Sequence, residues 1–360
     1  MSMAVKPSTD AADAGASQRA SVAADYAKVA NNAAGCCVSS AQNRGAVGYT
    51  PADLALVGDA DLGVGCGTPV RLAQLQTGEN VLDLGCGAGI DCLLAADAVG
   101  PAGRVVGVDM TPEMLARARA EALKSELAPP RLEFRLGEIE NLPCENDWAD
   151  AVISNCVVNL SPDKPAVLSE AWRVLSSGGE FYFSDVYCDR RLPEEIRSHP
   201  VLLGECLGGA MYVEDFKRLC VATGFADPRV LEGHEIEVRD EELKALLGEA
   251  RFYSLTYRLF KLPGRLESIC EDYGQYVVYK GTIDGHPNAY SLDDHHRIEK
   301  NKPFLVCGNT ASMLGETWLG AHFDVHGDRS THYGAFDCGG PPVAMPGGDG
   351  AGACASGACC

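Results

Sequence analysis

Short apolar runs alternate with amphipathic segments of helical spacing between about residues 79 and 190. The apolar runs predict five strands, at Val81–Leu84, Val105–Val108, Arg131–Leu136, Ala149–Val158 and Glu180–Val186. Helical spacing predicts helices at Asp91–Val99, from Thr111 to about Leu127, and at Lys164–Leu175. Regular alternation of strands and helices is typical of an α/β protein with a parallel, doubly wound sheet.

The flanking segments follow other patterns. Residues 1–35 predict a flexible leader with at most a turn or two of helix near its end, and residues 36–78 a loop-rich N-terminal cap that contains cysteines. Residues 79–190 are the expected cofactor-binding domain. After it the alternation stops, and residues 191–280 predict a smaller α+β region with helices near Tyr212–Thr223 and Glu241–Ala250 and a strand at Tyr276–Lys280. Residues 281–338 form a polar C-terminal region, and residues 339–360 a flexible tail rich in Gly and Cys.

Composition limits the classes of partner. The 360 residues are 46% hydrophobic and 22% charged, which is typical of a chain with a sizeable core. Thirty basic and 50 acidic residues give a net charge of −20, so nucleic acid and acidic membrane surfaces are not expected as partners. No stretch predicts a signal peptide or a membrane span. We expect a soluble, cytoplasmic monomer whose 16 cysteines serve packing, ligation or redox chemistry.

A glycine-rich turn follows the first expected strand. In Asp83-Leu84-Gly85-Cys86-Gly87-Ala88-Gly89 the glycines allow a tight turn and let a ligand approach the main-chain N–H groups. The acid before the turn suits a cationic ligand group better than a pyrophosphate. A second acid, Asp109, ends the next strand, where a carboxylate can accept both hydroxyls of a ribose.

This pattern resembles the S-adenosylmethionine site of class I methyltransferases, which have a Rossmann-like sheet. The resemblance implies that Asp83 lies near the methionine ammonium group, Asp109 on the ribose, Glu138 and Ile139 beside the adenine, and Asn155 near the reactive methyl group. A nicotinamide cofactor is the weaker alternative, because no matching catalytic pair is present. The full set of expected cofactor-binding residues is Asp83, Gly85, Gly87, Gly89, Asp91, Asp109, Met110, Glu138, Ile139 and Asn155.

Several cysteines are flanked by glycine or small polar residues instead of apolar runs. They are Cys156 in SNCVVNL, Cys206 in GECLGG, Cys66 in GVGCG, and the adjacent Cys36 and Cys37. Cysteines that only fill a core tend to be embedded in apolar sequence. Thiolates that converge from several loops above a cofactor would form a soft site for a thiophilic ion.

The chain resembles the arsenite S-adenosylmethionine methyltransferases. The matching segments are VISNCVVNL (152–160), GEFYFSDVY (179–187), LPEEIR (192–197), GECLGGAMY (204–212) and YRLFKL (257–262). The resemblance implies four functional cysteines, Cys37, Cys66, Cys156 and Cys206, with Cys36 as the substitute for Cys37. It further implies arsenic ligation by Cys66, Cys156 and Cys206, reduction through a Cys37–Cys66 pair, and an external thiol reductant of the glutathione or thioredoxin type. Arsenite and methylarsenite, including their thiol conjugates, are the implied substrates.

The same residues leave two alternative functions open. A carbon or oxygen methyltransferase of the sterol or quinone type would leave the glycine-flanked cysteines without a role. A thiol-rich metalloid buffer would leave the turn from Asp83 to Gly89 without one. Of the remaining groups, His286, His295 and His296 are expected to be solvated loop residues. Packing or incidental roles are expected for Cys86, Cys92, Cys144, Cys188, Cys220, Cys270 and Cys307.

Overall fold

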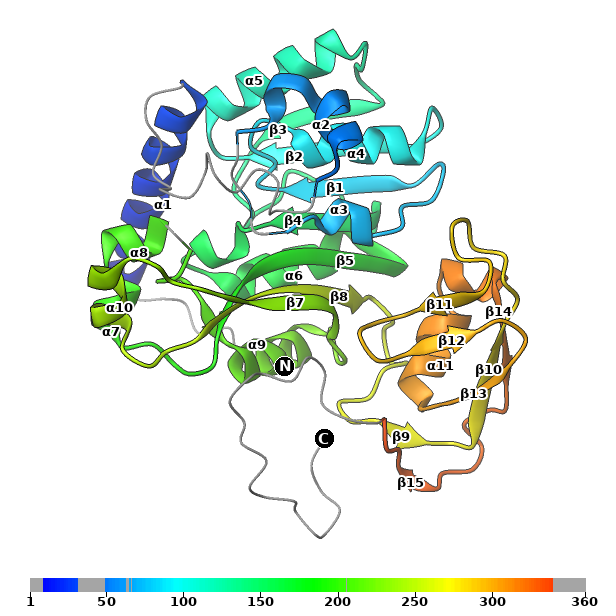
Figure 1. Cartoon of the computed structure of the whole chain (residues 1–360). Helices are drawn as coiled ribbons and strands as arrows, with labels where there is room; N and C mark the ends of the chain where they lie inside the picture. The colour runs from blue at the N-terminus through cyan, green and yellow to red at the C-terminus, as the bar shows by residue number, and fades with distance from the viewer. Residues whose placement is uncertain (1–8, 32–48, 63–64, 66, 205, 339–360) are drawn as a thin grey trace.

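A mixed eight-stranded sheet forms the centre of the protein (Figure 1). The computed structural model describes residues 9–31, 49–62, 65, 67–204 and 206–338. The strand order is β3-β2-β1-β4-β5-β8-β7, and the short β6 also pairs with β5. The strands are β1 (Asn80–Leu84), β2 (Arg104–Asp109), β3 (Leu132–Leu136), β4 (Ala149–Asn155), β5 (Leu175–Cys188), β6 (Met211–Tyr212), β7 (Arg229–Ile236) and β8 (Phe252–Phe260).

The first five strands are parallel to one another and confirm the predicted α/β class. Their connections carry the expected helices. These are α4 (Ile90–Val99), α5 (Pro112–Lys124) and α6 (Lys164–Val174), with the short helix η2 (Val158–Leu160) after β4. Both faces of the sheet are covered by apolar side chains, as the near-continuous burial of these strands requires.

Strands β7 and β8 extend the same sheet, although the sequence predicted a separate α+β region there. β8 lies antiparallel to β5 from Glu180↔Phe260 to Cys188↔Phe252 and is buried along its whole length. β5 is 14 residues long, and β8 pairs with nine residues of its edge, so the segment after β5 extends the sheet. The helices of this part are α7 (Glu194–Arg197), α8 (Pro200–Gly204), α9 (Val213–Thr223) and α10 (Glu241–Leu247).

Residues 9–30, expected to belong to a flexible leader, form the 22-residue helix α1 (Thr9–Ala30). Nine of its 22 residues are alanines, and alanine has the highest helix propensity. Tertiary contacts fix it as well, because Gln18 donates to the Leu160 carbonyl at 3.1 Å and Arg117 to the Ala30 carbonyl at 2.8 Å. In the cap, α2 (Pro51–Val57), η1 (Gly58–Ala60) and α3 (Pro69–Leu72) follow.

The C-terminal region has a core of its own. Its β10 (Gln275–Tyr279) lies antiparallel between β13 (Pro303–Val306) and β14 (Phe323–His326), so the predicted strand at 276–280 is confirmed and belongs to this region. Figure 1 shows the region on the side of the main sheet opposite α1. Its other elements are β9 (Glu271–Asp272), β11 (Ala289–Ser291), β12 (Arg297–Glu299), α11 (Gly308–Gly315), η3 (Trp318–Ala321) and β15 (Gly334–Ala335).

One histidine differs from its expected role. His296 is only 3% exposed, so the prediction of a solvated loop residue is wrong for it. Its Nδ1 lies 2.8 Å from Asp293 and 3.3 Å from the Arg229 guanidinium, and these partners compensate the burial of a polar ring.

None of the described helices combines the length and the apolar composition that a membrane span requires.

Candidate cofactor and thiol site

A cleft of about 1030 Å³ of empty volume opens at the carboxyl ends of β1, β2 and β4. Open α/β sheets bind ligands at this edge. Two of the expected cofactor residues are not in the lining: Gly89 is the N-cap of α4, and Glu138 faces Arg19 at 3.3 Å. The expected residues that line the cleft are Asp83, Gly85, Gly87, Asp91, Asp109, Met110, Ile139 and Asn155.

The glycine turn leaves room for a ligand. Gly87 has φ +51°, and a Cβ built on it would meet nothing within 4 Å, so its side faces the open cleft. At Gly85, with φ +67°, a Cβ would collide with the Val157 side chain. The Gly87 N–H donates to Asp109 Oδ2 at 2.9 Å, which ties the turn to the end of β2. The turn therefore needs glycine for two reasons, left-handed backbone and close approach.

Three buried carboxyl groups surround the cleft. Asp83, Asp91 and Asp109 are 2%, 3% and 9% exposed. Burial and the charge of Asp91 raise the pKa of Asp83 well above its usual range, burial raises the pKa of Asp91 to about 6, and burial raises the pKa of Asp109. Among the described residues, none of the three forms an ion pair with a basic side chain. Such a site favours a cationic ligand, because a positive charge offsets the cost of the buried carboxylates.

Asn155 connects the cleft to the N-terminal cap. Its Nδ2 donates to the Gly67 carbonyl at 2.7 Å and lies 3.3 Å from Asp91 Oδ2, while Oδ1 accepts from the Gly67 N–H at 3.3 Å. Tyr49 completes the network by donating to Asp91 Oδ1 at 2.8 Å. Gly65 lines the cleft, so the cap segment reaches the site. The expected functional residues Cys66 and Cys37 lie outside the described residues.

The structure brings Cys156 and Cys206 together. The Cys206 thiol points at the Cys156 carbonyl with 3.7 Å between sulfur and oxygen, and both residues are 8% exposed in one apolar cluster with Val22 and Leu160. Both have left-handed backbones, with φ +57° and +62°. Such conformations are uncommon outside glycine and often occur at functional sites.

Cys156 also lines the cofactor cleft, so the pair adjoins the glycine turn and the carboxyl groups. Its sulfur takes part in a disulfide bond. The structure therefore shows an oxidised form in which this sulfur is not a thiolate.

A partly buried lysine and a buried carboxylate lie near the cysteines, and the sequence analysis did not single them out. Burial lowers the pKa of Lys164 to about 8, although the charges of Asp185 and Cys206 act in the opposite direction. Burial raises the pKa of Asp185 to about 6, and this carboxylate accepts from the Asn159 side chain at 2.7 Å. Neither residue belongs to a recognisable sequence motif, so only the tertiary structure shows that the two lie near the cysteines.

Helix α1 supplies wall residues that the sequence analysis also missed. Arg19, Val22 and Tyr26 line the cleft. Their spacing of three and four places them on one face of the helix, and this is the signal that could have identified them.

Comparison with known proteins agrees with this geometry. A methyltransferase domain model matches residues 75–226. The arsenite methyltransferase of Aquipseudomonas alcaligenes is 51% identical over 282 residues, which cover 77% of this chain and 81% of the relative. The arsenite methyltransferase of Mus musculus is 41% identical over 260 residues, covering 69% and 67%. The crystal structure of an arsenic(III) S-adenosylmethionine methyltransferase from Chlamydomonas reinhardtii is 54% identical, with a TM-score of 0.75 over 80% of this chain and all of that one.

The sheet order, the cleft at the strand ends and the domain match define a class I methyltransferase. The two arsenite methyltransferases identify a family within this class. Each is more than 40% identical to this chain, and the alignment covers at least two thirds of its length. The chain belongs to the arsenite methyltransferase family.

Proposed function

We propose that this protein transfers methyl groups from S-adenosylmethionine to trivalent arsenic and gives methylated and dimethylated arsenicals, as a step of arsenic detoxification. The observation that carries the proposal is the position of two cysteines: Cys156 lines the carboxylate-lined cleft, and the Cys206 thiol lies 3.7 Å from the Cys156 carbonyl. The names of the similar proteins support both the methyl donor and the acceptor.

The cleft fits the cofactor by charge and by shape. Asp83 and Asp91 would face the cationic methionine part, Asp109 would accept the ribose hydroxyls, and Met110 and Ile139 would flank the adenine. Gly87 leaves its open side to the ligand. When bound, the cofactor supplies an electrophilic methyl group that the arsenic lone pair can attack. The protein contributes mainly orientation, because thiolate-bound arsenic already carries its nucleophilic electron pair.

Arsenic would be held by Cys156, Cys206 and Cys66. Arsenite exchanges its three hydroxyls for three sulfurs, and each hydroxyl leaves as water with a thiol proton. Because Cys156 is in a disulfide, this bond must be reduced before the ligand set is complete. The partly buried Lys164 would provide positive charge near Cys206.

Each methylation raises arsenic formally from the trivalent to the pentavalent state. Two protein thiols can return the two electrons by forming a disulfide, and Cys37 with Cys66 is our candidate pair. An external thiol of the glutathione or thioredoxin type would then reduce that disulfide. Because such thiols maintain reducing compartments, we also propose a cytoplasmic location.

The test is to incubate the full chain with arsenite, a thiol reductant and S-adenosylmethionine, and to separate the arsenicals by chromatography with mass detection. We expect mono- and dimethylated arsenic that depends on both the cofactor and the thiol. Reactions with demethylated quinones in place of arsenite serve as the control. Methylation of the quinone and none of arsenite would refute the proposal.

A further inference from the structure

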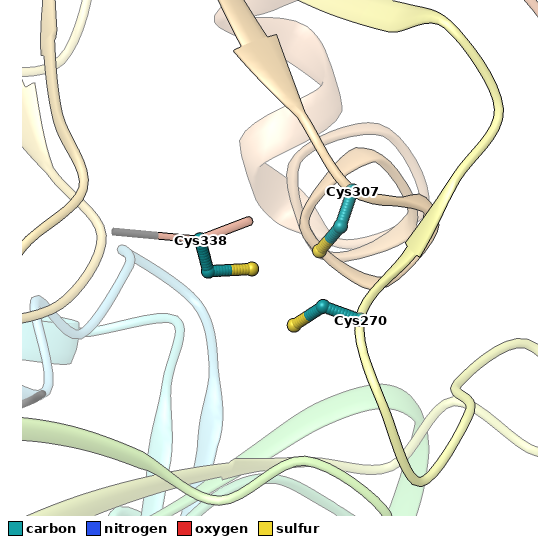
Figure 2. Close-up of side chains that lie close together, drawn as sticks. All are labelled: Cys270, Cys307 and Cys338. Atoms are coloured by element: carbon teal, nitrogen blue, oxygen red, sulfur yellow. The ribbon is translucent and has the colours of Figure 1, made fainter. Parts of the chain in front are cut away.

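Three cysteine thiols gather in the C-terminal region, away from the cofactor cleft. The sulfurs of Cys270, Cys307 and Cys338 all lie within 4.8 Å of one another. Figure 2 shows the three side chains pointing toward a common centre. This differs from the packing or incidental roles expected for Cys270 and Cys307, because packing alone gives no reason for three thiols to converge.

The strand pairing of this region brings the three residues together. Cys270 immediately precedes β9, which pairs antiparallel with β15, and the Phe336 N–H donates to the Cys270 carbonyl at 2.9 Å. Cys338 follows two residues later and therefore lies beside Cys270. Cys307 is the N-cap of α11, and its sulfur accepts from the Thr310 N–H at 3.4 Å. The cluster thus joins three segments that are distant in sequence.

The charged groups around the cluster favour a neutral complex. The buried Arg229 guanidinium carries a positive charge near Cys307. Arg229 itself is paired with Asp227 at 2.6 Å and Asp293 at 2.9 Å. Because two carboxylates already balance this cation, a ligand complex with a net negative charge would be disfavoured in this buried position.

The donor set indicates which ion fits. Within the described part of the chain, no imidazole nitrogen or carboxylate oxygen joins the three sulfurs. Structural zinc is almost always bound by four protein ligands, and three thiolates with zinc carry a net negative charge. Soft thiolates select thiophilic ions. Trivalent arsenic takes three thiolates and gives a neutral, trigonal complex.

We propose that Cys270, Cys307 and Cys338 form a second arsenite-binding site, separate from the site of methylation, which links three segments of the C-terminal region through one arsenic atom. Three As–O bonds break, three As–S bonds form, and three water molecules leave with the thiol protons. Arsenic stays trivalent, so the step needs no oxidant or reductant. The site goes beyond the proposed methylation, because α1 lines the cofactor cleft, and Figure 1 shows α1 on the opposite side of the main sheet from the C-terminal region.

Arsenic counting tests the site. The full-length protein is reduced, incubated with arsenite and desalted, and bound arsenic per chain is measured by elemental mass spectrometry. We expect Cys270→Ser and Cys338→Ser to bind one arsenic fewer than the wild type. The matched control is Cys144→Ser, which removes a partly buried thiol outside the cluster and should leave the count unchanged. Cys338→Ser should also keep the methylation rate of the wild type.

A second measurement uses the Cys156→Ser/Cys206→Ser protein, in which arsenic binding at the methylation site is disrupted. Arsenite should raise its melting temperature, since a ligand that binds only the folded state stabilises it, and adding Cys338→Ser should abolish the rise. Equal arsenic counts in wild type and Cys338→Ser would overturn the proposal, and so would one tightly bound zinc per chain that arsenite does not displace. Failure of the proposed methylation is distinguishable, because it would leave the difference between these counts intact.

Discussion

The cofactor cleft and the adjoining cysteine pair solve two different binding problems. The cleft takes its polar groups from the ends of parallel strands and from the glycine turn, which are fixed by the main sheet. The cysteines instead lie on loops after β4 and α8, at residues with left-handed backbones. Buried carboxylates bind by charge and need a rigid frame. Thiols bind by forming bonds, and their loops must also move, because the sulfurs approach when a disulfide forms and separate when it is reduced. The difference indicates that variants of the two parts should fail in different steps.

The largest effect is expected from the cysteine pair. Cys156→Ser or Cys206→Ser should reduce arsenite methylation by about 100-fold or more, because the arsenic loses a ligand that orients it. Binding of S-adenosylmethionine should stay within about twofold, since the carboxylates are untouched. Product analysis measures turnover, and calorimetry measures the affinity for the cofactor. Cys144→Ser is the matched control, and a joint loss of turnover and cofactor binding would contradict the separation of the two parts.

The opposite pattern is expected from a carboxylate of the cleft. Asp91→Asn removes one buried charge and should weaken S-adenosylmethionine binding by about 10- to 100-fold, the range for hydrogen bonds to charged groups. Arsenite binding to the reduced protein should not change. Asp97→Asn, on the exposed side of the same helix, provides the control. Cofactor affinity equal to that of the wild type would show that Asp91 does not face the ligand.

Cofactor affinity should also depend on pH. The pKa of Asp91 is about 6 in the free protein, and a bound cation favours the ionised form and lowers this pKa. Binding below pH 6 therefore releases a proton, so affinity falls as pH falls, by about tenfold between pH 7 and pH 5. S-Adenosylhomocysteine, which lacks the sulfonium charge, should show a weaker dependence. Calorimetric titrations in two buffers of different ionisation enthalpy would measure the proton release directly.

The smallest effect is expected at the wall formed by α1. Arg19 pairs with Glu138 at 3.3 Å, and both side chains are partly exposed, so the pair contributes at most about 1 kcal/mol. Arg19→Ala should change cofactor affinity less than about fivefold, and Arg19→Lys should preserve it. Equilibrium binding at low and high salt is the measurement. A loss as large as that of Asp91→Asn would place Arg19 among the residues that bind the cofactor directly.

The sequence predicted the cofactor cleft better than the arrangement of the cysteine pair. Apolar runs and the turn from Asp83 to Gly89 were enough to predict the parallel strands and most of the cleft, because these features depend on local periodicity. Strands β7 and β8 were missed as members of the main sheet, since nothing in their own pattern states which edge they pair with.

Contacts between distant residues were the least accessible to sequence reasoning. The proximity of Cys206 to Cys156 followed only from the family resemblance, and Cys338 was not singled out at all. Tyr49 and Lys164 are ordinary residues until the fold buries them beside Asp91 and Cys206. Such positions depend on long-range packing, and periodicity carries no information about it.

Helix α1 has a practical consequence for structural work. A shortened protein that begins at Tyr49 would keep every strand of the main sheet. It would nevertheless lack Arg19, Val22 and Tyr26, and the cleft would be open along one wall. Crystals of such a trimmed protein would preserve the architecture while underestimating how much of the methyl donor the intact enzyme encloses.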